Sequence, residues 1–153
     1  MLLGIIMSNI EKVASLLNQD DIRSRVIRDA AFFDYFVTLL IGLYFCPSSR
    51  ASEFVVNVGE RLSFEDKVTI LKKLEIDKQY KSLECISTLK KVQRLRNILA
   101  HEFYISHGHK VFNDNSITKW FADYPVSYKR DVKKAKMQLR RLADTKEFTK
   151  YHV

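Results

Sequence analysis

Helical spacing of apolar side chains runs through most of this chain, and few residues interrupt it. The sequence has 153 residues but only 4 Gly and 2 Pro, so long helices meet few of the residues that end them. No run alternates apolar and polar residues as a half-buried strand would. These patterns predict an all-α helical bundle that forms a single domain over residues 1–153.

The strongest helix signal lies in residues 30–45, which are apolar nearly all round and predict a central core helix. Pro47 ends this helix, and Ser63 followed by Asp66 predicts a capping box. We expect an up-and-down bundle of about five helices with a short irregular segment before the last one. The expected helical ranges are 8–18 (capped by Ser8), 20–45, 48–59, 63–74, 77–106 (capped by Asp77) and 127–147, with a short helix around 117–121 in the irregular segment.

The remaining composition excludes several classes of protein. Cys46 and Cys85 lie in apolar helical runs and are expected to be core thiols rather than a disulfide framework. The apolar start of the chain lacks the features of a signal peptide, and no apolar run is long enough to span a bilayer, so we expect a cytoplasmic protein without membrane contact. There is no Gly-rich phosphate loop and no paired-carboxylate motif, and no cofactor or metal is expected.

Positive charge is concentrated in the second half of the chain. The formal net charge is +8, and residues 125–153 alone carry 9 basic and 3 acidic side chains. Such a field attracts polyanions, most commonly nucleic acid, but a solvated lysine-rich helix face gives the same composition. Under the nucleic-acid interpretation the candidate contacts are Lys90, Arg94, Lys133, Lys136 and Arg140.

The segment Arg96-Asn97-Ile98-Leu99-Ala100-His101 carries most of the chemistry in this sequence. On a helix it places a fixed cation, an amide and a titratable imidazole within about one and a half turns. Two stripes share this helix. Val92, Leu95, Leu99 and Phe103 are expected to face the core, and Gln93, Asn97, Ala100, His101 and Tyr104 are expected to form a polar face.

The polar face indicates a site completed by a second copy of the chain. Cleaving RNA without a metal needs a base for the 2′-hydroxyl, a cation for the phosphorane and an acid for the leaving oxygen. His101 can serve as base or acid, and Arg96 can hold phosphate oxygens. One chain offers only one His on this face, whereas a twofold dimer offers two. The alternative is a polar network that locks helix packing or a dimer interface.

The Arg96-Asn97-x-x-x-His101 motif resembles the Arg-polar-x-x-x-His signature of the HEPN superfamily, which comprises small helical bundles, usually dimeric. The specific match covers about residues 88–104. The resemblance implies a metal-independent endoribonuclease that leaves 2′,3′-cyclic phosphate ends, as in toxins and antiphage effectors. It assigns phosphate contact to Arg96, acid–base chemistry to His101 and a supporting role to Asn97.

The resemblance also suggests an alternative function, and at one position the chain differs from known toxins of the superfamily. The helical layout is loosely similar to mannitol-repressor-like members, which implies a non-catalytic regulator or a module that binds RNA or protein. Toxins of the superfamily imply an antitoxin or nucleotidyltransferase as partner protein. Some carry a Tyr two residues after the His that such a partner modifies, whereas this chain has Phe103 there and Tyr104 one residue later.

Other candidate residues favour structural roles. His107 and His109 flank a Gly and have no Cys or acidic partner at ligand spacing, so a loop is favoured over a metal site. Trp120, Tyr124 and Tyr128 lie among basic residues and could stack on bases, but packing of the segment 110–126 is the favoured interpretation.

Overall fold

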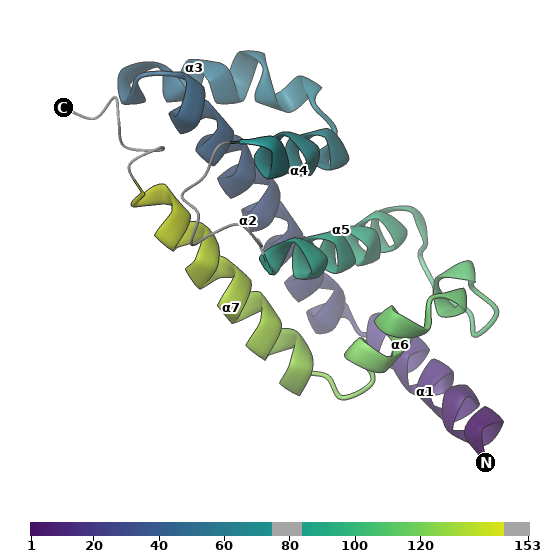
Figure 1. Ribbon diagram of the computed structural model, residues 1–153. Helices are drawn as coiled ribbons and strands as arrows, with labels where there is room; N and C mark the ends of the chain where they lie inside the picture. Colours follow the sequence, from purple (N-terminus) through teal and green to yellow (C-terminus); the bar gives the residue numbers. More distant parts are fainter. Residues whose placement is uncertain (75–83, 146–153) are drawn as a thin grey trace. The chain divides into compact units, whose positions relative to one another are not determined.

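The computed structural model describes residues 1–74 and 84–145, and this part of the chain is helical with no strand. The all-α prediction is therefore confirmed. The described residues form seven α-helices, more than the approximately five expected for the bundle (Figure 1). The elements are α1 (Leu2–Leu17), α2 (Asp20–Phe45), α3 (Ser48–Asn57), η1 (Gly59–Arg61), α4 (Phe64–Lys73), α5 (Cys85–His101), η3 (Lys110–Asn113), α6 (Asn115–Phe121) and α7 (Val126–Ala143).

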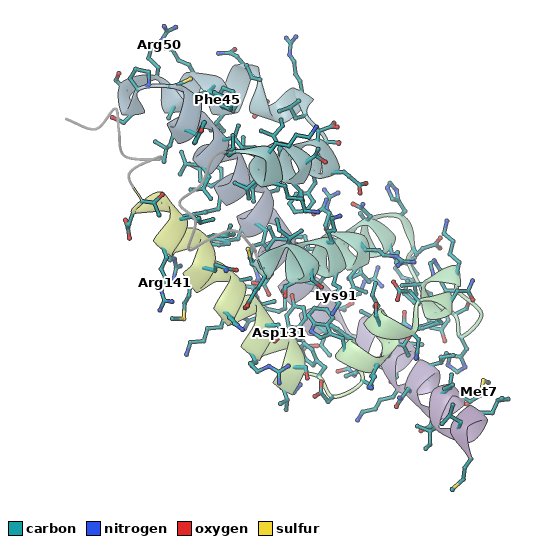
Figure 2. All side chains as sticks on the ribbon, in the orientation of Figure 1. Met7, Phe45, Arg50, Lys91, Asp131 and Arg141 are labelled. Atoms are coloured by element: carbon teal, nitrogen blue, oxygen red, sulfur yellow. The ribbon has the colours of Figure 1, made fainter. Side chains whose placement is uncertain are left out.

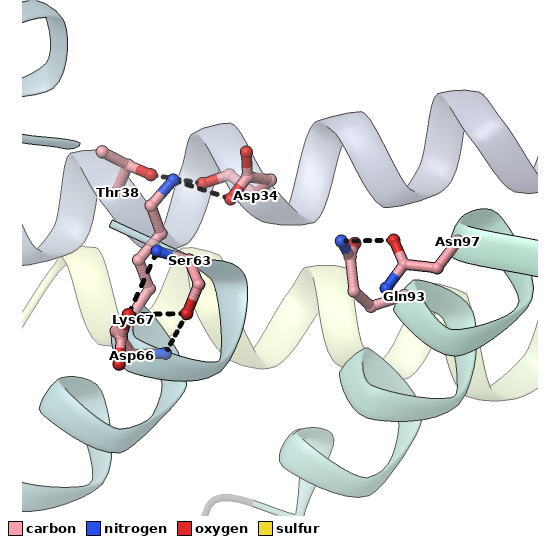
Figure 3. Close-up of polar contacts among 7 residues, drawn as sticks. All are labelled: Asp34, Thr38, Ser63, Asp66, Lys67, Gln93 and Asn97. Carbon is pink, nitrogen blue, oxygen red and sulfur yellow. Dashed lines mark hydrogen bonds and ion pairs between the residues drawn. The ribbon is translucent and has the colours of Figure 1, made fainter. Parts of the chain in front are cut away.

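Several helix ends lie where local sequence signals predict them. Helix α2 ends at Phe45, two residues before Pro47. The capping box that opens α4 is complete (Figure 3): Asp66 donates its backbone N–H to Ser63 Oγ at 3.1 Å, and Ser63 donates its own to Asp66 Oδ2 at 3.2 Å. The expected cap Asp77 lies outside the described residues. The last helix, α7, ends at Ala143, before the expected end near residue 147.

The start of α1 differs from the prediction. The helix begins at Leu2 rather than at Ser8, because the mostly apolar residues before Ser8 continue the helical turn through Gly4. Leu2 and Leu3 are 77% and 79% exposed, and Met7 also lies on this exposed stretch (Figure 2). No helix in the described ranges has the combination of length and apolar character that crossing a membrane requires.

The chain divides into two compact units. The first unit comprises Met1–Ala30 and Lys90–Lys133, and the second comprises Ala31–Leu89 and Lys134–Val153. Helices α2, α5 and α7 each contribute residues to both units. The motif residues Arg96 to His101 belong to the first unit.

The first unit is built around buried aromatic side chains. Helix α1 contacts α6, and Trp120, Phe121 and Tyr128 are buried beside the half-buried Tyr124. Tyr128 Oη donates a buried hydrogen bond of 2.8 Å to Asp29 Oδ2. The packing interpretation of this aromatic segment is therefore confirmed. The fully or mostly buried residues of the unit are Val13, Ala14, Leu17, Ile22, Val26, Asp29, Ala30, Val92, Leu95, Leu99, Ile105, Val111, Ile117, Thr118, Trp120, Phe121, Ala122, Tyr128 and Val132.

Two polar side chains contact the buried Trp120 ring. Trp120 Nε1 donates to Asp131 Oδ2 at 2.8 Å, and Lys91 Nζ lies 5.1 Å from the ring centroid. Lys91 and Asp131 are both labelled in Figure 2. Burial raises the pKa of the Tyr128 hydroxyl, and the neighbouring Asp29 carboxylate raises it further. The Tyr128 hydroxyl is therefore protonated at physiological pH and donates its hydrogen bond to Asp29.

The second unit contains a buried lysine and a close helix contact. Lys67 is 4% exposed and its Nζ donates to Asp34 Oδ1 at 2.8 Å (Figure 3). Gly59 is required where it stands, since a Cβ there would lie 2.2 Å from Thr38 Cγ2. Cys85 is buried, which raises the pKa of its thiol to about 12, whereas Cys46 is half-buried. Both thiols are free, as predicted, and only Cys85 is fully in the core.

Candidate active site

The last two turns of α5 carry the predicted catalytic residues on the surface of the first unit. Arg96, Asn97 and His101 are all exposed, and so is Ala100 among them. Val92, Leu95 and Leu99 face the core, with exposures of 0%, 0% and 5%. The sequence therefore divides this helix correctly into a buried stripe and a polar face up to His101.

The Asn97 amide is held in one orientation by two donors. Arg96 Nη1 donates to Asn97 Oδ1 at 3.2 Å, and Gln93 Nε2 lies 3.4 Å from the same oxygen. Figure 3 shows the contact between Gln93 and Asn97. The Asn97 amide nitrogen donates to no other group in the described ranges, so it can donate to an incoming phosphate or sugar oxygen.

His101 is the last residue of α5 and its imidazole projects into solvent. No group within residues 1–74 and 84–145 hydrogen-bonds to either ring nitrogen. A catalytic imidazole is normally oriented by a partner on its second nitrogen. Within the described ranges, one chain therefore provides no group that would orient the His101 ring.

Side chains far away in the sequence end α5 at His101. The Arg23 guanidinium donates to Leu99 O at 3.0 Å and to Glu102 O at 2.5 Å, which caps the carboxyl end of the helix. The Asn18 side chain donates to Ile105 O at 3.0 Å and accepts from Ile105 N at 2.7 Å. The same Arg23 also donates to Leu17 O at the end of α1.

This early ending overturns three expectations. The helix was expected to continue to about Ser106 but ends at His101. Phe103 was expected in the core and is 100% exposed. Tyr104 was expected on the polar helical face but lies beyond the helix, where it is 63% exposed. The physical reason is the capture of the Leu99, Glu102 and Ile105 backbone groups by Arg23 and Asn18.

The candidate nucleic-acid contacts occupy different environments. Arg94 forms an ion pair with Asp114, the N-cap residue of α6. The hydrogen bonds from Ser116 and the charge of Arg94 hold the Asp114 pKa below its usual range.

The other four candidate contacts lie in both units. Lys90 and Lys133 are exposed in the first unit. In the second unit, Lys136 Nζ and the Arg140 guanidinium lie 4.8 and 5.7 Å from the Phe32 ring centroid. Nucleic-acid binding by all five stays a prediction.

The histidine pair after the motif helix has a structural role at one position. His109 Nδ1 accepts from Val111 N at 3.0 Å and so caps η3, while its Nε2 lies 3.9 Å from Glu102 Oε1. His107 is exposed. Among the described residues, no three His, Cys, Asp or Glu side chains are grouped as a metal site would require. The capping hydrogen bond of His109 agrees with the expectation that this pair belongs to a structural loop.

The exposure of the motif residues tests the alternative interpretation that they form a polar network between helices. Because Arg96, Asn97 and His101 lie at the surface, they do not lock helices together within the described part of one chain. Searches against family models, curated proteins and solved structures find nothing that matches the chain, so the interpretation of this site rests on its own geometry.

Proposed function

We propose that the chain is a metal-independent endoribonuclease of the HEPN type that acts as a homodimer. The observation that carries the proposal is the exposed group at the end of α5, in which Arg96 and Gln93 orient Asn97 beside an uncommitted His101. A cation, an amide donor and an imidazole together match what phosphodiester cleavage needs. An RNA-directed toxin or antiphage effector, with an antitoxin or nucleotidyltransferase as partner, is the biological role this activity suggests.

The proposed reaction is an internal transfer at phosphorus. A neutral imidazole takes the proton of the 2′-hydroxyl, and the 2′-oxygen attacks the adjacent phosphorus. Arg96 stabilises the negative charge that develops on the non-bridging oxygens. An imidazolium then protonates the 5′-oxygen as its bond to phosphorus breaks, which leaves a 2′,3′-cyclic phosphate and a 5′-hydroxyl.

The proposal requires two copies of the chain because this reaction uses one neutral and one protonated imidazole. A single chain presents one His on the polar face. An isologous dimer across this face provides two His101 and two Arg96 side chains in one cleft. It also places Ala100, a small exposed residue, where two helices need to approach closely.

Cleavage of RNA in the presence of a chelator tests the proposal. His101→Ala is expected to lower the cleavage rate by about 10²- to 10⁴-fold, and Arg96→Ala by about 10²- to 10³-fold. His107→Ala and Arg28→Ala are matched controls, since both side chains are exposed in the same unit, and they should leave the rate unchanged. Equal cleavage by wild type and His101→Ala would remove the catalytic assignment.

The alternative is a non-catalytic HEPN-like regulator, or a module that binds RNA or protein through the same face. The observation that favours it is the His101 ring itself, which has no orienting partner in the described ranges. This alternative predicts that RNA remains intact with or without a chelator, in the presence of wild type and of His101→Ala alike.

A further inference from the structure

Phe103 is an unusual surface residue, because its ring is completely exposed two positions after the candidate catalytic His101. The adjacent Tyr104 is 63% exposed. A Phe side chain gains substantial free energy when its surface is removed from water. Two consecutive aromatic side chains left in solvent beside a polar site indicate that a ligand covers them.

The backbone that carries the two rings is fixed at both ends. Arg23 holds the carbonyl of Glu102, and Asn18 holds both the N–H and the C=O of Ile105. Ile105 itself is 0% exposed. Because the segment is anchored, little backbone ordering is required when a ligand covers the rings.

Charge distinguishes between the kinds of ligand that could cover these rings. The first unit holds 13 Lys and Arg against 8 Asp and Glu. On the last two turns of α5, which precede the rings in the sequence, Arg96 and His101 are exposed and offer donors for phosphate. A polyanion with flat apolar faces satisfies both features at once, and unpaired nucleic-acid bases on a phosphate backbone have this chemistry. The bases of a duplex are stacked on each other and offer no free face.

We propose that Phe103, assisted by Tyr104, is the base-stacking platform for single-stranded RNA and holds an unpaired base next to the scissile phosphate. This inference rests on the proposed ribonuclease function and specifies its substrate class. The rings position a base and take no part in proton transfer. A chain with this platform should bind single-stranded RNA more tightly than duplex RNA, because the bases of a duplex are already stacked on each other.

A fluorescent RNA that cannot be cleaved tests the platform separately from catalysis. The probe is a single strand of about twelve nucleotides, 2′-O-methylated throughout, with a central 2-aminopurine whose emission falls when it stacks. Wild type should quench it, whether or not it cleaves natural RNA. Phe103→Ala should abolish the quenching and weaken binding by about 5- to 100-fold, while Phe103→Tyr should retain quenching. Phe45→Ala, which removes an exposed ring of the second unit, should behave as wild type.

The outcomes distinguish base stacking by Phe103 from RNA cleavage and from a role of Phe103 in self-association. Quenching that depends on Phe103 supports the platform even if no RNA is ever cleaved. No binding by wild type, unchanged quenching in Phe103→Ala, or equal quenching with the annealed duplex would each overturn it. The proposal is also overturned if sedimentation shows that Phe103→Ala abolishes self-association while the variant still quenches the probe.

Discussion

At the scale of single residues, the polar side chains divide into those that hold the first unit together and those that remain available. Asp29 and Tyr128 form a buried bond, and Asp114 is occupied by Arg94 and Ser116. His101 and the amide nitrogen of Asn97 are uncommitted within the described ranges. Substitutions in the first group should change stability, and substitutions in the second should change function.

Removing the Tyr128 hydroxyl should destabilise the chain. Tyr128→Phe takes a donor from the buried Asp29 carboxylate, and a hydrogen bond to a charged group contributes about 1.5–3 kcal/mol. Chemical denaturation should show a loss of this size. The control Tyr35→Phe removes an exposed hydroxyl and should change the unfolding free energy by less than about 0.5 kcal/mol. Equal effects in the two variants would contradict this account of Asp29.

Asp114→Asn should destabilise the chain in a pH-dependent way. The lowered Asp114 pKa means that its charge stabilises the fold above the pKa of the unfolded chain, and that this contribution is lost as the pH falls through the folded value. Asn still caps α6, so only the charge is removed. Since the pair with Arg94 is partly exposed, the expected loss at pH 7 is about 0.5–1 kcal/mol.

Thermal unfolding measured across pH checks this expectation. The difference between wild type and Asp114→Asn should shrink as the pH falls below about 3.9, the pKa of an unfolded Asp, and through the lower pKa of the folded chain. A difference that stays constant over this range would mean that the carboxylate charge contributes nothing to folding.

At the scale of helices, local signals predict some boundaries and tertiary contacts determine others. Pro47 and the Ser63–Asp66 capping box act within one turn of the residues they affect, so the sequence reveals them. The segment after His101 contains no Gly or Pro until Gly108. Helix α5 ends there because Arg23 and Asn18, 76–87 residues away in the chain, bind its terminal backbone groups. No local pattern could have predicted that Phe103 is exposed.

Asn18→Ala should loosen the segment that follows α5. The variant loses both hydrogen bonds to Ile105, at a cost of about 2 kcal/mol. Native-state hydrogen exchange should show faster exchange of the Ile105 amide. The control Asn57→Ala alters an exposed side chain in α3 and should leave that amide unchanged. Unchanged Ile105 protection in Asn18→Ala would show that Asn18 does not hold this segment.

At the scale of the whole molecule, the proposed activity belongs to a pair of chains. The sequence predicts which residues share the polar face, and Arg96, Asn97 and His101 are indeed exposed together on α5. A single chain contains no second imidazole on that face and no orienting partner for His101 in its described part. Each chain therefore carries half of the proposed reaction site.

Mixed dimers test this claim most directly. Wild-type and His101→Ala chains, refolded together and assayed on RNA in a chelator, should pair at random. If each site needs both imidazoles, an equal mixture should retain about one quarter of the activity of the same total amount of wild type. Activity in direct proportion to the wild-type fraction, or no cleavage by wild type alone, would contradict the account.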